Sequence, residues 1–283
     1  MRFGYVLLEE TPAVVAMAAD ARPGDWHRLD IANELPDVLE ADWSEVEASY
    51  RRGQAVQADK LRFLAPITRP SKIVAIGLNY MDHCREQNIK PPDKPLIFAK
   101  FPSSITGPHT LIEWDPALTS AVDYEAELAV IIGKQARRVS AEQALRYVFG
   151  YTCANDVTAR DLQHGDGQWV RGKSLDTFCP LGPVVVTTDE IETPQKLAIR
   201  CEVNGQRLQD SNTSEMIFDV KTIVAYASQA FTLYPGDIIL TGTPHGIGYS
   251  REPRVSLHNG DTVAVEIERI GRLENTCREV TQS

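Results

Sequence analysis

Residues 122–132 read V-D-Y-E-A-E-L-A-V-I-I and place two carboxylates, Glu125 and Glu127, inside a run of apolar residues. A run rich in β-branched and aliphatic residues predicts a buried strand. Side chains at positions i and i+2 of a strand point to the same face, so the two carboxylates would converge, with Cα atoms about 6 to 7 Å apart. Like charges at that spacing repel each other. A divalent cation with oxygen ligands would offset the repulsion.

A third acid, Asp156, follows a second strand-like run, residues 151–155. A single glutamate on a strand usually faces solvent, and this is the simpler interpretation of either glutamate taken alone. Both faces of the predicted strand are apolar, however, and carboxylates in such surroundings need a partner. Three carboxylates without histidine or cysteine favour magnesium or manganese over zinc. We therefore predict a Mg²⁺ or Mn²⁺ site with Glu125, Glu127 and Asp156 as ligands.

The composition limits the kinds of partner. At 283 residues and 43% hydrophobic content, the chain can bury a full core, as one large domain or as a large and a small one. A formal net charge of -10 argues against nucleic acid or an anionic membrane, both of which require basic surfaces. Five cysteines without CxxC spacing indicate neither a disulfide framework nor a thiolate zinc site. With no signal-peptide or membrane-span pattern at the N-terminus, we expect a cytoplasmic protein that binds a small molecule.

The N-terminal part of the sequence differs from the rest. Residues 1–68 mix short apolar runs with acidic segments and carry no cluster of groups suited to catalysis. Two prolines in residues 64–70, L-A-P-I-T-R-P, mark a boundary because proline removes a backbone donor and restricts its neighbour. We therefore predict a small N-terminal domain, 1–68, and a catalytic domain, 69–283. Strand signals outnumber helix signals in the latter, which predicts a mixed β core with a few covering helices.

Four local signals predict specific elements of the second domain. The Asn-Gly pair at 204–205 predicts a hairpin, and Asp219 before an apolar i, i+3, i+4, i+7 pattern predicts an amphipathic helix. Ser140 opens the capping box S-A-E-Q, which predicts a helix that ends at Gly150. Residues 165–172, G-D-G-Q-W-V-R-G, predict a loop that can close over a ligand.

Three further residues are candidates for catalysis. His83 and Glu86 are three residues apart, so one helical turn places both on the same side, where the carboxylate would orient the imidazole for proton transfer. A surface histidine beside an acid is the simpler interpretation of that spacing. Lys173 follows the glycine-rich segment in the context G-K-S-L-D, although a lysine is by default solvated. A phosphate-binding Walker loop is excluded because the upstream glycine is missing.

Six motifs follow one another across roughly residues 70 to 270. They are G-L-N-Y-M-D-H-C-R-E (77–86), D-Y-E-A-E-L-A-V-I-I-G (123–133), N-D-V-T-A-R-D-L-Q (155–163), G-K-S-L-D-T-F-C-P-L-G-P (172–183), V-N-G-Q-R-L-Q-D-S-N-T (203–213) and G-D-I-I-L-T-G-T-P (236–244). In this order they resemble the fumarylacetoacetate hydrolase superfamily, in the branch with acylpyruvate hydrolases, oxaloacetate decarboxylases or tautomerases, and hydroxymuconate-type isomerases and decarboxylases. Two positions depart from the pattern, Leu175 after K-S and His245 after T-G-T-P, and both bear on the choice of substrate.

The resemblance implies a role for each candidate. The implied metal ligands for Mg²⁺ or Mn²⁺ are Glu125, Glu127 and Asp156, the implied catalytic dyad is His83 and Glu86, the group that stabilises an enolate oxygen is Lys173, and the residues near the substrate are Gln163 and Thr243. The implied fold is a mixed β-roll, often with a small N-terminal domain, and the implied assembly is a homodimer.

The resemblance also limits the chemistry. The leading hypothesis is a metal-dependent hydrolase or lyase that cleaves a carbon–carbon bond of a small 2,4-dioxo acid of the acylpyruvate type, through a metal-stabilised pyruvate enolate. The first alternative is an isomerase, tautomerase or decarboxylase of hydroxymuconate-like dienoates or oxaloacetate. A second alternative, from another class, is a non-catalytic dimer that binds a metal and a ligand. The intact set of His83, Glu86 and Lys173 argues against this last alternative.

Overall fold

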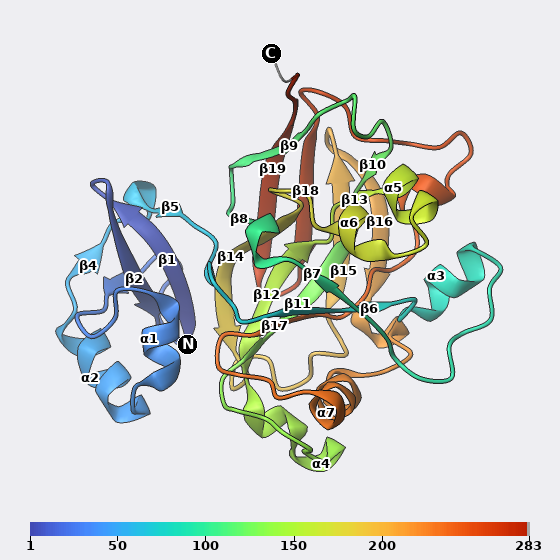
Figure 1. Ribbon diagram of the computed structural model, residues 1–283. Helices are drawn as coiled ribbons and strands as arrows, with labels where there is room; N and C mark the ends of the chain where they lie inside the picture. Colours follow the sequence, from blue (N-terminus) through green and yellow to red (C-terminus); the bar gives the residue numbers. More distant parts are fainter. Residues whose placement is uncertain (282–283) are drawn as a thin grey trace.

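The computed structural model describes residues 1–281 and confirms the predicted strand-rich fold with few helices (Figure 1). The strands are β1 (Arg2–Leu8), β2 (Thr11–Met17), β3 (Trp26–Arg28), β4 (Ala55–Val56), β5 (Arg62–Phe63), β6 (Ile73–Gly77), β7 (Leu96–Lys100), β8 (Ile105–Thr106), β9 (Leu111–Trp114), β10 (Val122–Asp123), β11 (Ala126–Ile132), β12 (Val148–Asn155), β13 (Thr158–Ala159), β14 (Cys179–Thr187), β15 (Ala198–Val203), β16 (Gln206–Asn212), β17 (Ile238–Leu240), β18 (Thr262–Ile267) and β19 (Gly271–Glu279). The helices are α1 (Leu35–Glu40), α2 (Trp43–Arg52), α3 (Met81–Glu86), α4 (Ala141–Ala144), α5 (Arg160–Gly165), α6 (Trp169–Lys173) and α7 (Val220–Ala230). Short 3-10 turns occupy residues 58–60, 102–104, 145–147, 213–215 and 248–250.

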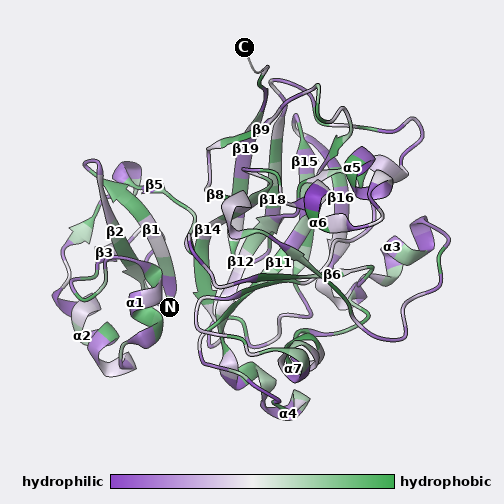
Figure 2. Cartoon of the chain, in the orientation of Figure 1, coloured by the Kyte–Doolittle hydropathy of each residue, from purple (hydrophilic) through white to green (hydrophobic). Residues whose placement is uncertain are grey.

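A large mixed sheet forms the centre of the molecule. Its strands follow the order β4-β3-β2-β1-β14-β12-β11-β17-β6-β7, with β5 and β8 paired at its side. All seven residues of β11 are buried, since Leu128 and Val130 pack into one apolar cluster while Ala129 and Ile131 pack into another on the opposite face. A strand that is buried on both faces needs a continuous apolar run, which is the pattern in the sequence. Figure 2 shows the same strand as predominantly hydrophobic.

A second sheet, in the order β16-β15-β18-β19-β9, packs over one face of the large sheet. Ile199 of β15 and Val265 of β18 belong to the same apolar cluster as Leu128 of β11, so the two sheets enclose one core. Burial of this shared apolar surface is the main force that holds the two layers together. The helices lie outside the sheets, with α7 and α4 at the lower edge in Figure 1.

The N-terminal strands and the helices α1 and α2 lie to one side of the molecule (Figure 1). β1 joins the large sheet through antiparallel pairing with β14, where Arg2 lies opposite Val186 and Phe3 opposite Val185. The N-terminal residues therefore continue the same sheet. The division into domains 1–68 and 69–283 stays a prediction.

Two of the local predictions are confirmed. β15 and β16 form an antiparallel hairpin, and Asn204 and Gly205 in its turn have φ angles of 51° and 77°, as an Asn-Gly turn requires. The helix predicted after Asp219 is α7, and the Asp219 side chain accepts a hydrogen bond from the backbone N–H of Thr222. This bond satisfies one of the free donors at the start of the helix.

Two local predictions are wrong, at least in part. The Ser140 side chain makes no capping hydrogen bond, and α4 ends at Ala144. Gly150 lies inside β12, where a Cβ would come within 2.3 Å of the carbonyl oxygen of Val186 on β14, so this glycine serves close strand pairing and does not end a helix. The predicted loop 165–172 is partly helical, because α6 begins within it at Trp169.

Candidate active site

Four neighbouring strands of the large sheet bring the candidate residues together at one end of these strands. β11 runs antiparallel to β12 and β17, and β17 runs parallel to β6. The start of β11 and the ends of the other three strands therefore lie on the same side of the sheet. The residues next to these strand ends are Glu125 before β11, Asp156 after β12, Thr243 after β17, and His83 in the helix that follows β6. Residues far apart in sequence thus meet at one place because of the order of the strands.

The three predicted metal ligands lie together. Each of Glu125, Glu127 and Asp156 offers a carboxylate oxygen, and these oxygens all lie within 4.8 Å of one another. All three side chains are buried. Glu125 lies just before β11 rather than within it, and its backbone N–H donates to the side chain of Asn155 at 3.0 Å. The predicted convergence of the carboxylates is therefore present in the structure.

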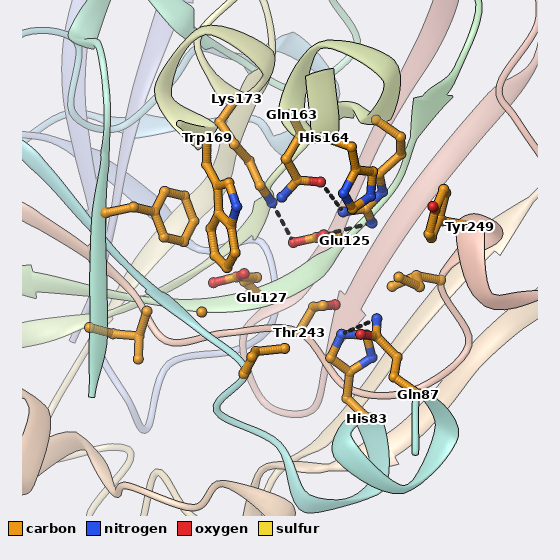
Figure 3. A pocket seen from close by; sticks show the side chains of 16 residues that line it. His83, Gln87, Glu125, Glu127, Gln163, His164, Trp169, Lys173, Thr243 and Tyr249 are labelled. Carbon is orange, nitrogen blue, oxygen red and sulfur yellow. Dashed lines mark hydrogen bonds and ion pairs between the residues drawn. The ribbon is translucent and has the colours of Figure 1, made fainter. Parts of the chain in front are cut away.

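Buried cations surround two of the three carboxylates. The Lys173 ammonium lies 2.8 Å from a Glu125 oxygen and 2.7 Å from an Asp156 oxygen, and the Lys100 ammonium lies 2.6 Å from the other Asp156 oxygen. The Arg160 guanidinium lies 2.7 Å from the second oxygen of Glu125. Figure 3 shows Lys173 reaching down to Glu125 from the helices above the cavity. The site is thus a dense network of buried opposite charges.

The charges act on the two glutamates in opposite directions. Burial raises the pKa of Glu125, but the charges of Lys173 and Arg160 outweigh it and lower this pKa from 4.5 to about 2. Burial and the neighbouring charges of Asp156 and Glu125 raise the pKa of Glu127 well above its usual value. Within residues 1–281, no lysine or arginine nitrogen lies within 4.0 Å of the Glu127 carboxylate, which accepts a hydrogen bond from the Gly242 N–H at 2.7 Å.

This arrangement fits a hard divalent cation. A buried carboxylate without a cationic partner, beside two further carboxylates, is the oxygen donor set that Mg²⁺ and Mn²⁺ prefer. A bound cation would supply the positive charge that Glu127 lacks. The binding of a metal here, and the identity of that metal, stay predictions.

The predicted dyad is assembled on α3. His83 Nδ1 lies 3.1 Å from a Glu86 oxygen, and the other Glu86 oxygen accepts from the Gly246 N–H at 2.8 Å. Burial raises the pKa of Glu86, but these hydrogen bonds outweigh it and lower the pKa below its usual range. Glu86 therefore stays ionised and orients the imidazole, as the spacing predicted.

A cavity of about 100 Å³ lies between the carboxylates and the dyad. His83 of α3 and Gln87 just after α3 reach into it, while Gln163, Trp169 and Lys173 reach into it from α5 and α6 (Figure 3). Thr243, the other residue predicted to lie near substrate, also lines the cavity, and its hydroxyl accepts from the Gln209 amide at 2.9 Å. All predicted site residues except Glu86 and Asp156 line this cavity, and those two contact residues that do. Their roles stay predictions.

Comparison with known proteins identifies the family. The profile described as "Fumarylacetoacetate (FAA) hydrolase C-terminal" matches residues 72–278. The chain belongs to the fumarylacetoacetate hydrolase family. Among curated members of the family, the chain is 50% identical over 221 residues to "Oxaloacetate tautomerase Fahd2a, mitochondrial" of Rattus norvegicus, covering 78% of this chain and 70% of that protein. It is 49% identical over 251 residues to "Oxaloacetate tautomerase FAHD2A, mitochondrial" of Homo sapiens, covering 85% of this chain and 80% of that protein.

Two solved structures confirm the predicted fold. A 5-carboxymethyl-2-hydroxymuconate delta-isomerase from Mycobacterium smegmatis matches with a TM-score of 0.82 and 37% identity, over 99% of this chain and 100% of that one. A fumarylacetoacetate hydrolase from Exiguobacterium antarcticum matches with a TM-score of 0.87 and 37% identity, over the same shares of the two chains.

The sequence did not predict three residues of the site, which are Lys100, Arg160 and Gln87. Lys100 contacts both Asp156 and the backbone carbonyl of Lys173, and Arg160 lies between Asp123 and Glu125. Arg160 belongs to the motif N-D-V-T-A-R-D-L-Q, so its position carried a signal. Lys100 ends a strand-like run and has no motif beside it. Gln87, which contacts His83, lies directly after the motif at residues 77–86.

No helix in residues 1–281 is both long and apolar enough to cross a membrane. The curated relatives named above are described as mitochondrial. The cytoplasmic location therefore stays a prediction for this member of the family.

Proposed function

We propose that this protein is a metal-dependent tautomerase that interconverts the enol and keto forms of oxaloacetate. The identity of about half of the aligned residues with oxaloacetate tautomerases is the observation that carries the proposal. It favours the tautomerase alternative over the hydrolase that the sequence first suggested. Two similar solved structures are described as isomerases of hydroxymuconate-type acids, so an isomerase of this kind is the second candidate.

The buried charges suit an anionic 2-oxo acid. Glu125, Glu127 and Asp156 would hold the cation, which when bound polarises the 2-oxo group and offsets negative charge on its oxygen. Lys173 adds a fixed positive charge beside this position, because burial opposes its charged form but Asp156 and Glu125 outweigh it and raise the Lys173 pKa. Lys173 therefore keeps its proton and stabilises an enolate oxygen by charge rather than by proton transfer.

Tautomerisation requires one proton at carbon to move. In the direction from enol to keto, the enol hydroxyl releases its proton to solvent, its electrons form the C2 carbonyl, and C3 takes up a proton. We assign the proton transfer at C3 to His83 Nε2, since its other nitrogen is held by Glu86. In this direction Nε2 first takes up a proton from solvent and then gives it to C3, which returns the imidazole to its neutral form. In the reverse direction Nε2 takes the C3 proton. No carbon–carbon bond breaks in either direction.

A parallel assay tests the proposal against the alternatives. Enol-oxaloacetate is followed by its ultraviolet absorption, with acetylpyruvate and a hydroxymuconate as the other substrates, in Mg²⁺, in Mn²⁺ and in EDTA. The uncatalysed rate in buffer is subtracted for each substrate. Metal-dependent loss of the enol with little cleavage of acetylpyruvate would support the tautomerase. Cleavage of acetylpyruvate as the fastest reaction would instead favour the hydrolase.

A further inference from the structure

Both ring nitrogens of His83 already have partners within α3 and at its end. Nδ1 lies 3.1 Å from a Glu86 carboxylate oxygen, and Nε2 lies 3.1 Å from the amide nitrogen of Gln87 (Figure 3). A carboxylate only accepts hydrogen bonds and an amide NH₂ only donates them. The arrangement is therefore satisfied by a neutral imidazole with its hydrogen on Nδ1 and a lone pair on Nε2. Gln87, four residues after His83, supplies the donor to that lone pair.

The Gln87 amide also fills space beside the reactive nitrogen. Gln87 is half-buried and lines the same cavity of about 100 Å³ as His83, Glu125 and Lys173. The Gln87 amide nitrogen already occupies the hydrogen-bonding position beside Nε2, at 3.1 Å. A water can take up that position only if the amide moves away.

We propose that Gln87 is a positioning residue that selects the reaction: its amide donates to the lone pair on His83 Nε2 and so keeps a hydrolytic water away from that nitrogen. The inference rests on the proposed tautomerase function and explains why a site with a complete dyad favours proton transfer over hydrolysis.

The two reactions place different demands on Nε2. In hydrolysis, water gives a proton to Nε2, its oxygen bonds to the distal carbonyl carbon, and the carbon–carbon bond breaks with its electron pair going to the 2-oxo acid fragment, which is then protonated at carbon. A water must therefore fit between Nε2 and the substrate. In tautomerisation the substrate carbon exchanges its proton with Nε2 directly. The Gln87 side chain lies just beyond the end of α3 and has rotatable bonds, so it can yield to the substrate carbon itself.

Two substitutions separate filled space from hydrogen bonding. Gln87→Ala removes both, whereas Gln87→Met keeps a side chain of similar length without the donor. Gln206→Ala, at an exposed position in β16 away from the cavity, is the control. The kcat and KM of each variant are measured for tautomerisation of enol-oxaloacetate and for hydrolysis of acetylpyruvate, with Mg²⁺ present.

We expect Gln87→Ala to raise the ratio of hydrolysis to tautomerisation by about tenfold or more, which corresponds to about 1.4 kcal/mol between the two barriers. The change should lie in kcat with little change in KM, because Gln87 acts through His83. Gln87→Met and Gln206→Ala should keep the wild-type ratio. An unchanged ratio in a folded Gln87→Ala protein would overturn the inference.

Nitrogen-15 NMR of histidine-labelled protein gives a readout that does not depend on turnover. The wild type should show hydrogen on Nδ1 of His83 and a lone pair on Nε2. Gln87→Met should keep that hydrogen, because Glu86 still accepts it, while the Nε2 resonance moves to that of a lone pair without the Gln87 donor. A wild-type spectrum with hydrogen on Nε2 would overturn the inference, even if Gln87→Ala failed to fold. Absence of tautomerase activity in the wild type would refute the proposed function instead, whereas the difference in the Nε2 resonance between wild type and Gln87→Met tests the contact of Gln87 separately.

Discussion

Replacing Glu127 by glutamine should stabilise the metal-free protein and remove its response to metal. The Glu127 carboxylate is buried within 4.8 Å of oxygens from Glu125 and Asp156. Glutamine has nearly the same shape, keeps an acceptor for the Gly242 N–H and carries no charge. The substitution therefore removes the repulsion with little loss of packing.

The size of the effect follows from the spacing. Two unit charges about 4.8 Å apart repel by about 3 kcal/mol at an effective dielectric constant of about 20. Glu127 has two such neighbours, and the Lys173 charge offsets part of their effect. We expect a net gain of about 3 kcal/mol in the free energy of unfolding in EDTA, or roughly 6 to 12 °C in Tm. Because the pKa of Glu127 is raised, its carboxylate becomes charged and destabilises the folded wild type only as the pH rises through that pKa. The higher unfolding free energy of Glu127→Gln relative to wild type should therefore be present at alkaline pH and vanish in acid.

Thermal and urea unfolding of wild type and Glu127→Gln, with EDTA or with excess Mg²⁺, test this. Metal at 100 times its Kd should stabilise the wild type by about 2.7 kcal/mol and the variant far less. Glu192→Gln, at an exposed glutamate, is the matched control and should change neither value. The reasoning fails if Glu127→Gln is less stable than wild type in EDTA at alkaline pH, or if Mg²⁺ stabilises both proteins equally.

Three further predictions concern the rest of the site and the assembly. His83→Ala should lower kcat for tautomerisation by about 10²- to 10⁴-fold while leaving Mg²⁺-induced stabilisation intact, and an unchanged kcat would remove His83 from the mechanism. Lys173→Met should abolish activity and cost about 3 to 5 kcal/mol, because it leaves buried charges on Glu125 and Asp156 unpaired. In the wild type the lowered pKa of Glu125 contributes stability that is present above pH 4.5 and is lost as the pH falls toward about 2. Without the Lys173 charge this pKa should be higher, so the acid unfolding of Lys173→Met should begin at a higher pH than that of the wild type. Light scattering should give about twice the chain mass of 31.4 kDa if the predicted homodimer forms, whereas the monomer mass at micromolar concentration would contradict it.

The parts of the site that the sequence predicted are those set by local geometry. The strand around Glu127 followed from a continuous apolar run, and the contact between His83 and Glu86 followed from the pitch of a helix. Asp156 was predicted as the third ligand because it follows a second strand-like run. It lies beside the glutamates because β12 pairs with β11, and that pairing cannot be read from local spacing.

The parts that the sequence did not predict depend on tertiary placement. Lys100 reaches Asp156 across 56 residues of chain, and no periodic pattern records such a contact. Ser140 has the spacing of a capping box, but β12 starts soon after it, and the sheet pairing of Gly150 outweighs a weak local preference for helix. No sequence pattern pointed to Gln87, because its proposed role depends on the contact of its amide with His83 Nε2 in the folded protein.

The central claim is that the site moves a proton at the carbon next to a 2-oxo group and breaks no carbon–carbon bond. Proton NMR of oxaloacetate in deuterium oxide, with enzyme and Mg²⁺, measures this directly. The account predicts enzyme-dependent entry of deuterium at C3, faster than in buffer, with the four-carbon skeleton intact and with the excess rate lost in EDTA. Pyruvate formed as fast as deuterium enters, or exchange no faster than in buffer, would contradict it.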